Sequence, residues 1–140
     1  MNKKYERYIE YIVNDLQPPY FKNMRDSYGL SEKEYPLVLS KIFKQPVSIM
    51  GNNQHVYGEL ERIIYSEYNN GYWQKHEYDN DGNRTYLQDS YGFWSKYEYD
   101  ANGNEIYYET SDGFWEKWEY DDRGNLIYNE DSDGNIEDRR

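Results

Sequence analysis

The stretch that decides the fold is residues 113–133, which read Gly-Phe-Trp-Glu-Lys-Trp-Glu-Tyr-Asp-Asp-Arg-Gly-Asn-Leu-Ile-Tyr-Asn-Glu-Asp-Ser-Asp. Residues 71–91 and 92–112 are earlier copies of the same unit, and each copy begins 21 residues before the next with no insertion. A fixed period of this size is typical of a repeat architecture. A degenerate copy precedes them, so we expect about four units that begin near Gly51.

Each copy predicts two strands and two tight turns. The first strand is the aromatic run, such as residues 93–99, and the second follows the Gly-Asn pair, such as residues 105–109. Asp-x-x-Gly sequences form the turns, because Asp accepts backbone N–H bonds and Gly tolerates a positive φ. The alternation of short strands and turns predicts an antiparallel meander of roughly eight strands.

The odd period constrains the two faces of this sheet. Because side chains alternate across a strand, an odd repeat reverses its faces unless a bulge intervenes or one turn has an even loop. We therefore expect the Asp-Ser-x-Gly turn to differ from the Asp-x-x-Gly-Asn turn. Pairing the first Asp of the latter turn with its Asn places Tyr128 beside Trp118 on one face and Ile127 beside Lys117 on the other.

Composition divides the chain into a helical N-terminal cap, residues 1–50, and a repeat array with an acidic tail, residues 51–140. The first part carries a net charge of +2 and the second −13. We expect an α+β fold, with a short N-terminal helical segment followed by an antiparallel β-meander built from about four 21-residue repeats. The 19 tyrosines suit a thin sheet, since tyrosine buries its ring while its hydroxyl stays in water.

Three helices are expected in the cap. Apolar side chains at helical spacing favour a first helix over residues 4–16, which two prolines then end. A second short helix is expected over residues 20–28. The third helix opens at a capping box beginning at Ser31, or at Tyr35 with a proline in its first turn, and it ends near Phe43. Its expected buried side is Leu37, Val38, Ile42 and Phe43.

The pattern Trp-x-Lys-x-Glu-Tyr-Asp-x-x-Gly-Asn-x-x-Tyr resembles the YD repeats of RHS-type proteins, in which Tyr-Asp and a Gly-Asn turn recur at about this period. The resemblance covers residues 51–133. The chain is also similar to small phage-encoded proteins that join a short helical start to an array of this kind. Neither resemblance implies a catalytic residue.

The residues predict neither an enzyme nor a cofactor. No Ser/His/Asp signature, phosphate-binding Gly loop or HExxH motif is present. The run from Asp79 begins like a calcium loop, but Ser90 stands at the twelfth position and Arg123 replaces an acid in the last copy, which favours a plain turn. His55 and His76 lie one period apart on strands, with no cysteine beside them, so we expect no metal site.

The expected compartment is the cytoplasm of a bacterial host. The chain has no cysteine, no apolar run long enough to span a membrane, and an amphipathic start where a secretion signal would be apolar. Together with the resemblance to phage proteins, these features predict a protein without a membrane partner.

Two further binding modes compete with these expectations. Residues 20–43 could form a helix-turn-helix, although the acidity of the chain would oppose DNA. Trp73, Trp94 and Trp115 form a ladder that either braces the strands or offers platforms to a sugar or a quaternary amine.

The acidic residues define the candidate site. Residues 51–140 hold 21 Asp and Glu, and spread over a sheet these charges could imitate a nucleic-acid backbone. We expect a non-catalytic protein-binding module, a phage-encoded inhibitor of the anti-CRISPR or anti-restriction type. It would occupy a basic nucleic-acid-binding surface of a host protein without binding nucleic acid directly. The alternatives are a carbohydrate- or cell-wall-binding module that uses the Trp/Tyr ladder, and a structural virion or assembly protein. The expected partner-binding residues are Glu98, Glu105, Glu109, Asp112, Glu116, Trp118, Glu119, Asp122, Glu130 and Asp131.

Overall fold

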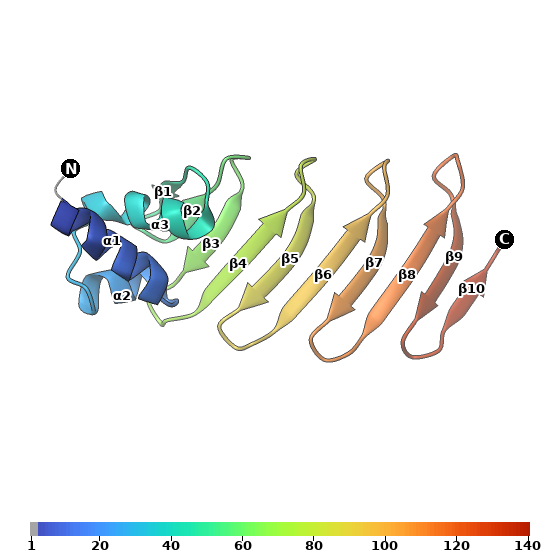
Figure 1. The fold of residues 1–140 in the computed structure, drawn as a ribbon. Coiled ribbons are helices and arrows are strands. Elements are labelled where there is room, and N and C mark those ends of the chain that lie inside the picture. The colour runs from blue at the N-terminus through green and yellow to red at the C-terminus, as the bar shows by residue number, and fades with distance from the viewer. Residues whose placement is uncertain (1–2) are drawn as a thin grey trace. The chain divides into compact units, whose positions relative to one another are not determined.

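The computed structural model describes residues 3–140, which form a helical segment followed by an antiparallel meander sheet (Figure 1). Hydrogen-bonded strands follow the order of the sequence, from β1 to β10. The expected α+β class is confirmed, but the sheet has ten strands rather than roughly eight. One added strand precedes Gly51, and the other, β10 (Ile136–Asp138), lies within the expected tail.

The chain forms two compact units, the first ending at Gln74 and the second running over Lys75–Arg140. The expected division of residues 1–50 from 51–140 follows composition and stays a prediction. The helices are α1 (Lys3–Asp15), α2 (Tyr20–Asp26), the 3₁₀ helix η1 (Glu32–Glu34) and α3 (Tyr35–Phe43). The first strands are β1 (Ser48–Met50), β2 (His55–Tyr57), β3 (Ile63–Glu67) and β4 (Trp73–Tyr78), and the later ones are β5 (Arg84–Asp89), β6 (Trp94–Tyr99), β7 (Glu105–Thr110), β8 (Trp115–Tyr120) and β9 (Leu126–Asp131).

The third helix follows the second of its two expected starts. It begins at Tyr35 with Pro36 in its first turn, where the missing N–H costs no helical hydrogen bond. The capping box lies in η1, because the Ser31 N–H donates to Glu34 Oε1 at 3.1 Å. Its buried side differs from the expected one: Val38 is buried together with Tyr35 and Leu39, whereas Leu37, Ile42 and Phe43 remain partly exposed.

A true core exists in the first unit, where α2 meets β3. Tyr65 is fully buried, and its ring centroid lies 4.8 Å from that of Tyr20. Glu67 accepts bonds from the N–H groups of Phe21 and Lys22, both at 2.9 Å, and from the Tyr65 hydroxyl at 2.6 Å. The carboxylate therefore satisfies two backbone donors at the start of α2 that lack helical partners. Burial, assisted by the Glu67 charge, raises the pKa of Tyr65.

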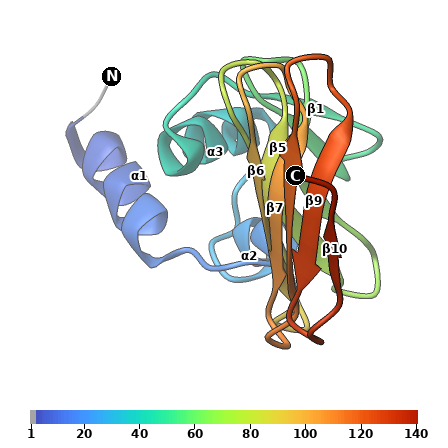
Figure 2. The ribbon, with the colours of Figure 1, turned by 90° about the vertical axis from the view of Figure 1, so that its right-hand side faces the viewer.

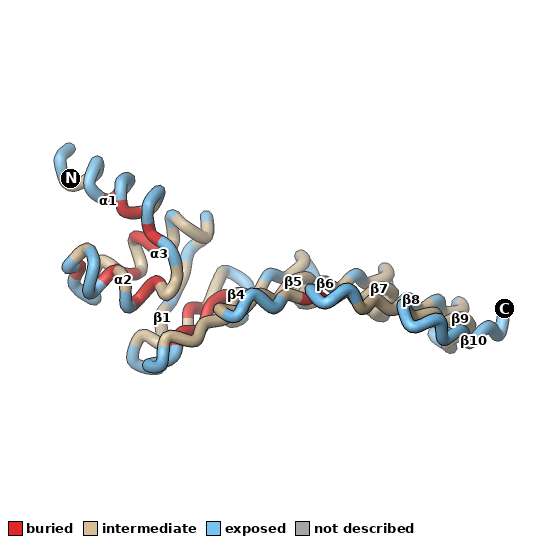
Figure 3. The backbone as a smooth tube through the Cα atoms, turned by 90° about the horizontal axis from the view of Figure 1, so that it is seen from below, coloured by how far each residue is buried: buried red, intermediate tan, exposed pale blue. Residues whose placement is uncertain are grey.

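The second unit has no comparable core. Of residues 75–140, only Ser95 and Thr110 are buried. The strands from β5 to β10 are coloured almost entirely as intermediate or exposed in Figure 3. Viewed along the sheet, its strands overlap one behind another in a single layer (Figure 2). Half-buried tyrosine rings supply much of the packing, as between Tyr97 and Tyr108, whose centroids lie 5.2 Å apart. The thin tyrosine-rich sheet expected from composition is therefore present.

The two kinds of turn close loops of the same length, so the expected difference in parity between them is wrong. The Asp-Ser-x-Gly turn differs in one respect, because the Ser132 N–H also donates to the Trp115 carbonyl at 2.9 Å. In the Asp-x-x-Gly-Asn turn, the Asp100 N–H donates to the Asn104 carbonyl at 2.9 Å. In the Asp-Ser-x-Gly turn, the Asp131 N–H donates to the Asn135 carbonyl at 3.0 Å. In both, the Asp Oδ1 also accepts from the backbone N–H two and four residues ahead.

Bulges correct the parity of the odd period instead. In the β8–β9 pair, Glu119 faces Tyr128 and Tyr120 faces Leu126, which leaves Ile127 as the extra residue. A matching register shift occurs in the β6–β7 pair, 21 residues earlier. The expected placement of Tyr128 beside Trp118 is therefore wrong, because the bulge moves Tyr128 to the face of Glu119.

Two faces of the second unit follow from the strand registers. At each position of the ladder face the same residue type recurs in the next copy, whereas most positions of the mixed face, apart from Tyr99 and Tyr120, change residue type. The ladder face comprises Trp94, Lys96, Glu98, Tyr107, Glu109, Trp115, Lys117, Glu119, Tyr128 and Glu130. The mixed face comprises Ser95, Tyr97, Tyr99, Glu105, Tyr108, Thr110, Glu116, Trp118, Tyr120, Leu126, Asn129 and Asp131.

Candidate protein-binding site

All of the net charge lies in the second unit. Lys75–Arg140 contains seven Lys and Arg against 18 Asp and Glu, a net charge of −11. The first unit contains nine of each and is neutral. Long-range attraction for a basic partner therefore comes from the second unit.

The expected partner-binding residues divide between opposite sides of the sheet. The two groups cannot contact one flat partner surface at once, because side chains that alternate along a strand point away from each other. Glu98, Glu109, Glu119 and Glu130 belong to the ladder face. Glu105, Glu116, Trp118 and Asp131 belong to the mixed face, and Asp112 and Asp122 lie in turns.

Carboxylates of the mixed face are largely engaged within the sheet. Glu116 Oε2 accepts a bond from Asn129 Nδ2 at 2.8 Å. Asp131 accepts the backbone bonds of its turn, which lie at 3.0 and 3.1 Å. Burial raises the pKa of Glu105, and the charge of Glu116 adds to the effect. This face therefore offers a partner few carboxylates that lack an internal partner.

On the ladder face, lysine ammonium groups lie over tryptophan rings of their own strands. Lys96 Nζ is 4.9 Å from the ring centroid of Trp94, and Lys117 Nζ is 5.0 Å from that of Trp115. This is the range of a cation–π contact. One side of each of these indole rings is consequently already occupied.

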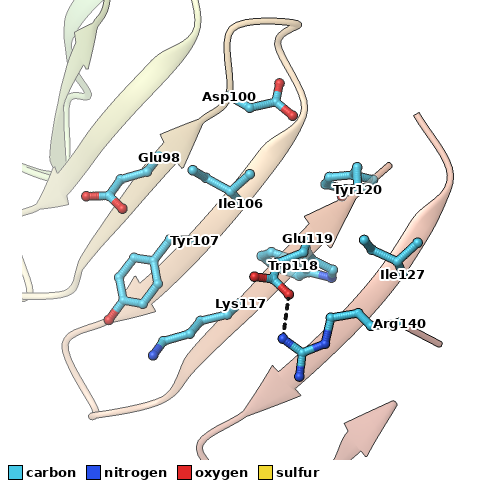
Figure 4. Close-up of a pocket in the computed structure, with 10 residues that line it drawn as sticks. All are labelled: Glu98, Asp100, Ile106, Tyr107, Lys117, Trp118, Glu119, Tyr120, Ile127 and Arg140. Carbon is cyan, nitrogen blue, oxygen red and sulfur yellow. Dashed lines mark hydrogen bonds and ion pairs between the residues drawn. The ribbon is translucent and has the colours of Figure 1, made fainter. Parts of the chain in front are cut away.

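Arg140 lies on the same face and bonds to its carboxylates. Its guanidinium carbon is 3.9 Å from the ring centroid of Tyr128. Its Nη1 donates to Glu119 Oε2 at 3.1 Å (Figure 4). Its Nε donates to Asp138 Oδ1 at 3.0 Å. The bond to Arg140 holds the pKa of Asp138 below its usual range. This aromatic and carboxylate setting suits a planar guanidinium.

A shallow groove of about 610 Å³ lies beside this arginine (Figure 4). The bulge residues Ile106 and Ile127 give it apolar surface, while Glu98, Tyr107 and Glu119 supply its polar groups. Sequence reasoning placed three of its lining residues, Glu98, Trp118 and Glu119, in the site but missed Ile106, Tyr107 and Ile127. The signal that could have found these three is the odd period, which requires either a bulge or an even turn in each unit.

His76 belongs to the second unit, and its Nδ1 is buried without a hydrogen-bond partner. Burial lowers its pKa to about 4, and the nearby charge of Arg84 adds to the effect. The imidazole is therefore neutral at neutral pH. The equivalent positions in later copies hold Tyr97 and Trp118.

The run that begins like a calcium loop forms a turn. Asp79 Oδ1 accepts from the N–H groups of Asp81 and Asn83, at 3.0 and 2.9 Å, so the carboxylate holds its own backbone in place. Within residues 3–140, no three His, Cys, Asp or Glu side chains are grouped to hold a metal ion.

Comparisons with known proteins assign the chain to no family. No protein-family model matches the chain, and no curated protein matches it. The resemblance to YD repeats therefore stays a prediction. Over the same described residues, no helix combines the length and apolarity that crossing a membrane requires.

Proposed function

We propose that the chain is a non-catalytic protein-binding module whose second unit occupies a basic, nucleic-acid-binding surface of another protein. The observation that carries this proposal is the confinement of the whole net charge of −11 to a sheet of one layer. Such a sheet presents carboxylates on strands spaced about 4.8 Å apart, with no second layer of its own unit to cover them. The negative electrostatic field of the sheet would attract a basic surface, and the complementary charges would fix the orientation in which it binds.

The finer features of the proposal come from the sequence. The array would hold about four 21-residue units beginning near Gly51, of the YD type. The resemblance to small phage-encoded proteins makes an inhibitor of the anti-CRISPR or anti-restriction type the proposed class. Its target would be a bacterial cytoplasmic protein that binds nucleic acid.

The alternative of a carbohydrate-binding Trp ladder is less well supported. A sugar stacks on an open aromatic face, whereas Lys96 and Lys117 already lie over Trp94 and Trp115. A sugar on that side of either indole would have to displace an ammonium group. At Glu98 no comparable obstacle faces a basic partner, because this exposed carboxylate reaches solvent on the same face.

Affinity capture from a bacterial lysate tests the proposal, with the immobilised full chain used at about 0.05 M and about 0.5 M salt. The captured proteins should be nucleic-acid-binding proteins, should be displaced by added nucleic acid, and should be lost at high salt. Capture that is independent of salt and unaffected by nucleic acid would contradict the proposal.

A matched pair of variants locates the attraction. The first combines Glu98→Gln, Glu109→Gln and Glu130→Gln in the second unit, and it should lose most of the captured protein. The second makes the same change in charge on exposed residues of the first unit and should retain it. The first-unit substitutions are Glu6→Gln, Glu10→Gln and Glu59→Gln. Equal losses of captured protein from both variants would place the contact elsewhere.

A further inference from the structure

The chain itself shows how the ladder face holds a guanidinium. Arg140 lies 3.9 Å above the ring of Tyr128 and bonds to Glu119 at 3.1 Å. Glu119 and Tyr128 face each other directly across the β8–β9 pair. A tyrosine ring and a carboxylate on adjacent strands thus form one binding site for an arginine side chain.

The same pair occurs 21 residues earlier without an arginine. Glu98 faces Tyr107 across the β6–β7 pair, in the register that joins Glu119 to Tyr128. The residue one period before Arg140 is Glu119, so this copy has an acid where the next copy has the arginine. Among the described residues, no hydrogen bond or ion pair engages the Glu98 carboxylate. The earlier copy therefore keeps the acceptor groups of the site and lacks its cation.

The groove of about 610 Å³ lies at this earlier pair. Ile106 and Ile127 provide apolar surface for the methylene stem of a long side chain, while Glu98 provides the main acceptor for its head. Glu119 adds the carboxylate oxygen that Arg140 does not use. Lys117 also lines the groove, but its ammonium group lies 5.0 Å from the ring centroid of Trp115. Figure 4 shows the Lys117 ammonium directed away from the Glu119 carboxylate.

We propose that the ladder face binds arginine side chains of an extended, basic segment of the partner, and that one arginine enters the groove between Glu98, Tyr107 and Glu119. This inference rests on the proposed function and names the chemistry that its second unit recognises. Arginine suits the site better than lysine, because a planar guanidinium can stack on the tyrosine ring while it bonds to a carboxylate.

The repeat sets the spacing of the arginines. Tyr86 and Glu77 precede Tyr107 and Glu98 by one period, and they lie on the adjacent strands β5 and β4. Equivalent sites are two strands apart, which is about 9.6 Å. A segment in the extended polyproline II conformation advances about 3.1 Å per residue with three residues per turn, so arginines at every third position point the same way and match the sites.

The probe is a synthetic peptide with four arginines, each separated from the next by Gly-Ser, titrated into the full chain at low salt. Glu98→Gln should weaken its binding about fivefold, since a charge-assisted bond is lost. Glu116→Gln, the same change on the mixed face, should leave binding nearly unchanged. Peptides with lysine in place of arginine, or with arginine at every second position, should bind more weakly. Equal effects of Glu98→Gln and Glu116→Gln would overturn the assigned site.

A gain of binding gives a second test that a misfolded variant cannot imitate. Arg140→Ala vacates the Tyr128–Glu119 site, so the peptide should bind several-fold more tightly. Arg139→Ala removes the same charge from a residue paired with Glu137 and should have a smaller effect. No gain with Arg140→Ala beyond that of Arg139→Ala would overturn the inference. Capture of salt-sensitive, nucleic-acid-binding proteins without peptide binding would leave the proposed function standing and remove this inference alone.

Discussion

The two units of the chain are stabilised in different ways. The first unit packs its three helices and early strands around fully buried residues such as Ile12, Met24 and Leu39. The second unit buries almost nothing, and turns, bulges and cross-strand contacts recur in it at a fixed interval. A neutral unit with a core is thus joined in sequence to an acidic unit without one.

This difference indicates how far the effect of a single substitution should extend within each unit. In a packed core one deleted side chain affects all its neighbours, because the cavity cannot fully collapse. In a repeat sheet each copy contacts only the adjacent copies, so a defect stays local. Few buried contacts also make the second unit the more easily opened one. The following changes test this comparison.

The largest effect is expected in the core of the first unit. Leu39→Ala should lower the free energy of unfolding by about 2–5 kcal/mol, because the side chain is fully buried. Leu60→Ala is the matched control, since Leu60 is 46% exposed and should change stability by less than about 0.5 kcal/mol. Urea unfolding measures both. Similar losses for the two leucines would remove the distinction between core and surface.

The next effect concerns the buried hydroxyl of Tyr65. Tyr65→Phe removes the donor to Glu67 and the acceptor of the Tyr20 N–H, which should cost about 1–3 kcal/mol at neutral pH. Because burial raises the pKa of Tyr65, the unfolded chain loses this proton near pH 10 while the folded chain keeps it. Stability should therefore fall above about pH 10.

In the Tyr65→Phe variant that alkaline loss should be smaller than in the unmodified chain. Tyr11→Phe, at a residue 60% exposed, should keep the full loss. Urea unfolding at about pH 7 and about pH 11 measures both. An alkaline loss of equal size in the two variants would refute the role given to Tyr65.

A stabilising change is expected at His76. Its pKa is lowered to about 4 by burial, whereas the unfolded imidazole takes a proton near its ordinary value of about 6.5. Stability should therefore fall as pH decreases from about 6.5 to about 4. His76→Tyr introduces the residue found at Tyr97, removes the unpaired Nδ1, and should add about 1 kcal/mol. Thermal unfolding at two pH values checks this, and an unchanged pH dependence would contradict it.

The smallest effect is expected at a turn of the second unit. Hydrogen bonds, chiefly from the Asn125 N–H, hold the pKa of Asp121 below its usual range. Its contribution to stability is present above about pH 4 and is lost as pH falls further. Asp121→Asn should accelerate hydrogen exchange only in this hairpin. Asp122→Asn, at an exposed neighbour, should not. Accelerated exchange in distant hairpins would show that the repeats are more tightly coupled than this account holds.

The sequence was sufficient to predict local structure where the residue pattern is strict. The Asp-x-x-Gly turns follow from propensities that act within a few residues, and the observed helix start at Tyr35 is one of the two starts that the sequence left open. The buried side of α3 was predicted less well, because packing against the rest of the unit, and not helical periodicity alone, decides that Leu39 is buried and Ile42 is not.

The faces of the sheet were harder to predict. The odd period requires a correction of parity, but it does not say whether a turn or a bulge supplies it. The bulge at Ile127 moved Tyr128 to the ladder face. The expected acidic site divides for a separate reason, because Trp118 and Glu119 alternate along one strand. The role of Arg140 was missed for a related reason, since its contact with Glu119 joins residues that are 21 positions apart.

Hydrogen exchange of the full chain with and without the arginine peptide tests the central claim most directly, because it reports both units in one experiment. The account predicts slower exchange within residues 75–140, strongest in β6 to β9, and unchanged exchange in residues 3–74. Protection confined to residues 3–74 would contradict it, because the neutral unit and not the acidic sheet would then make the contact.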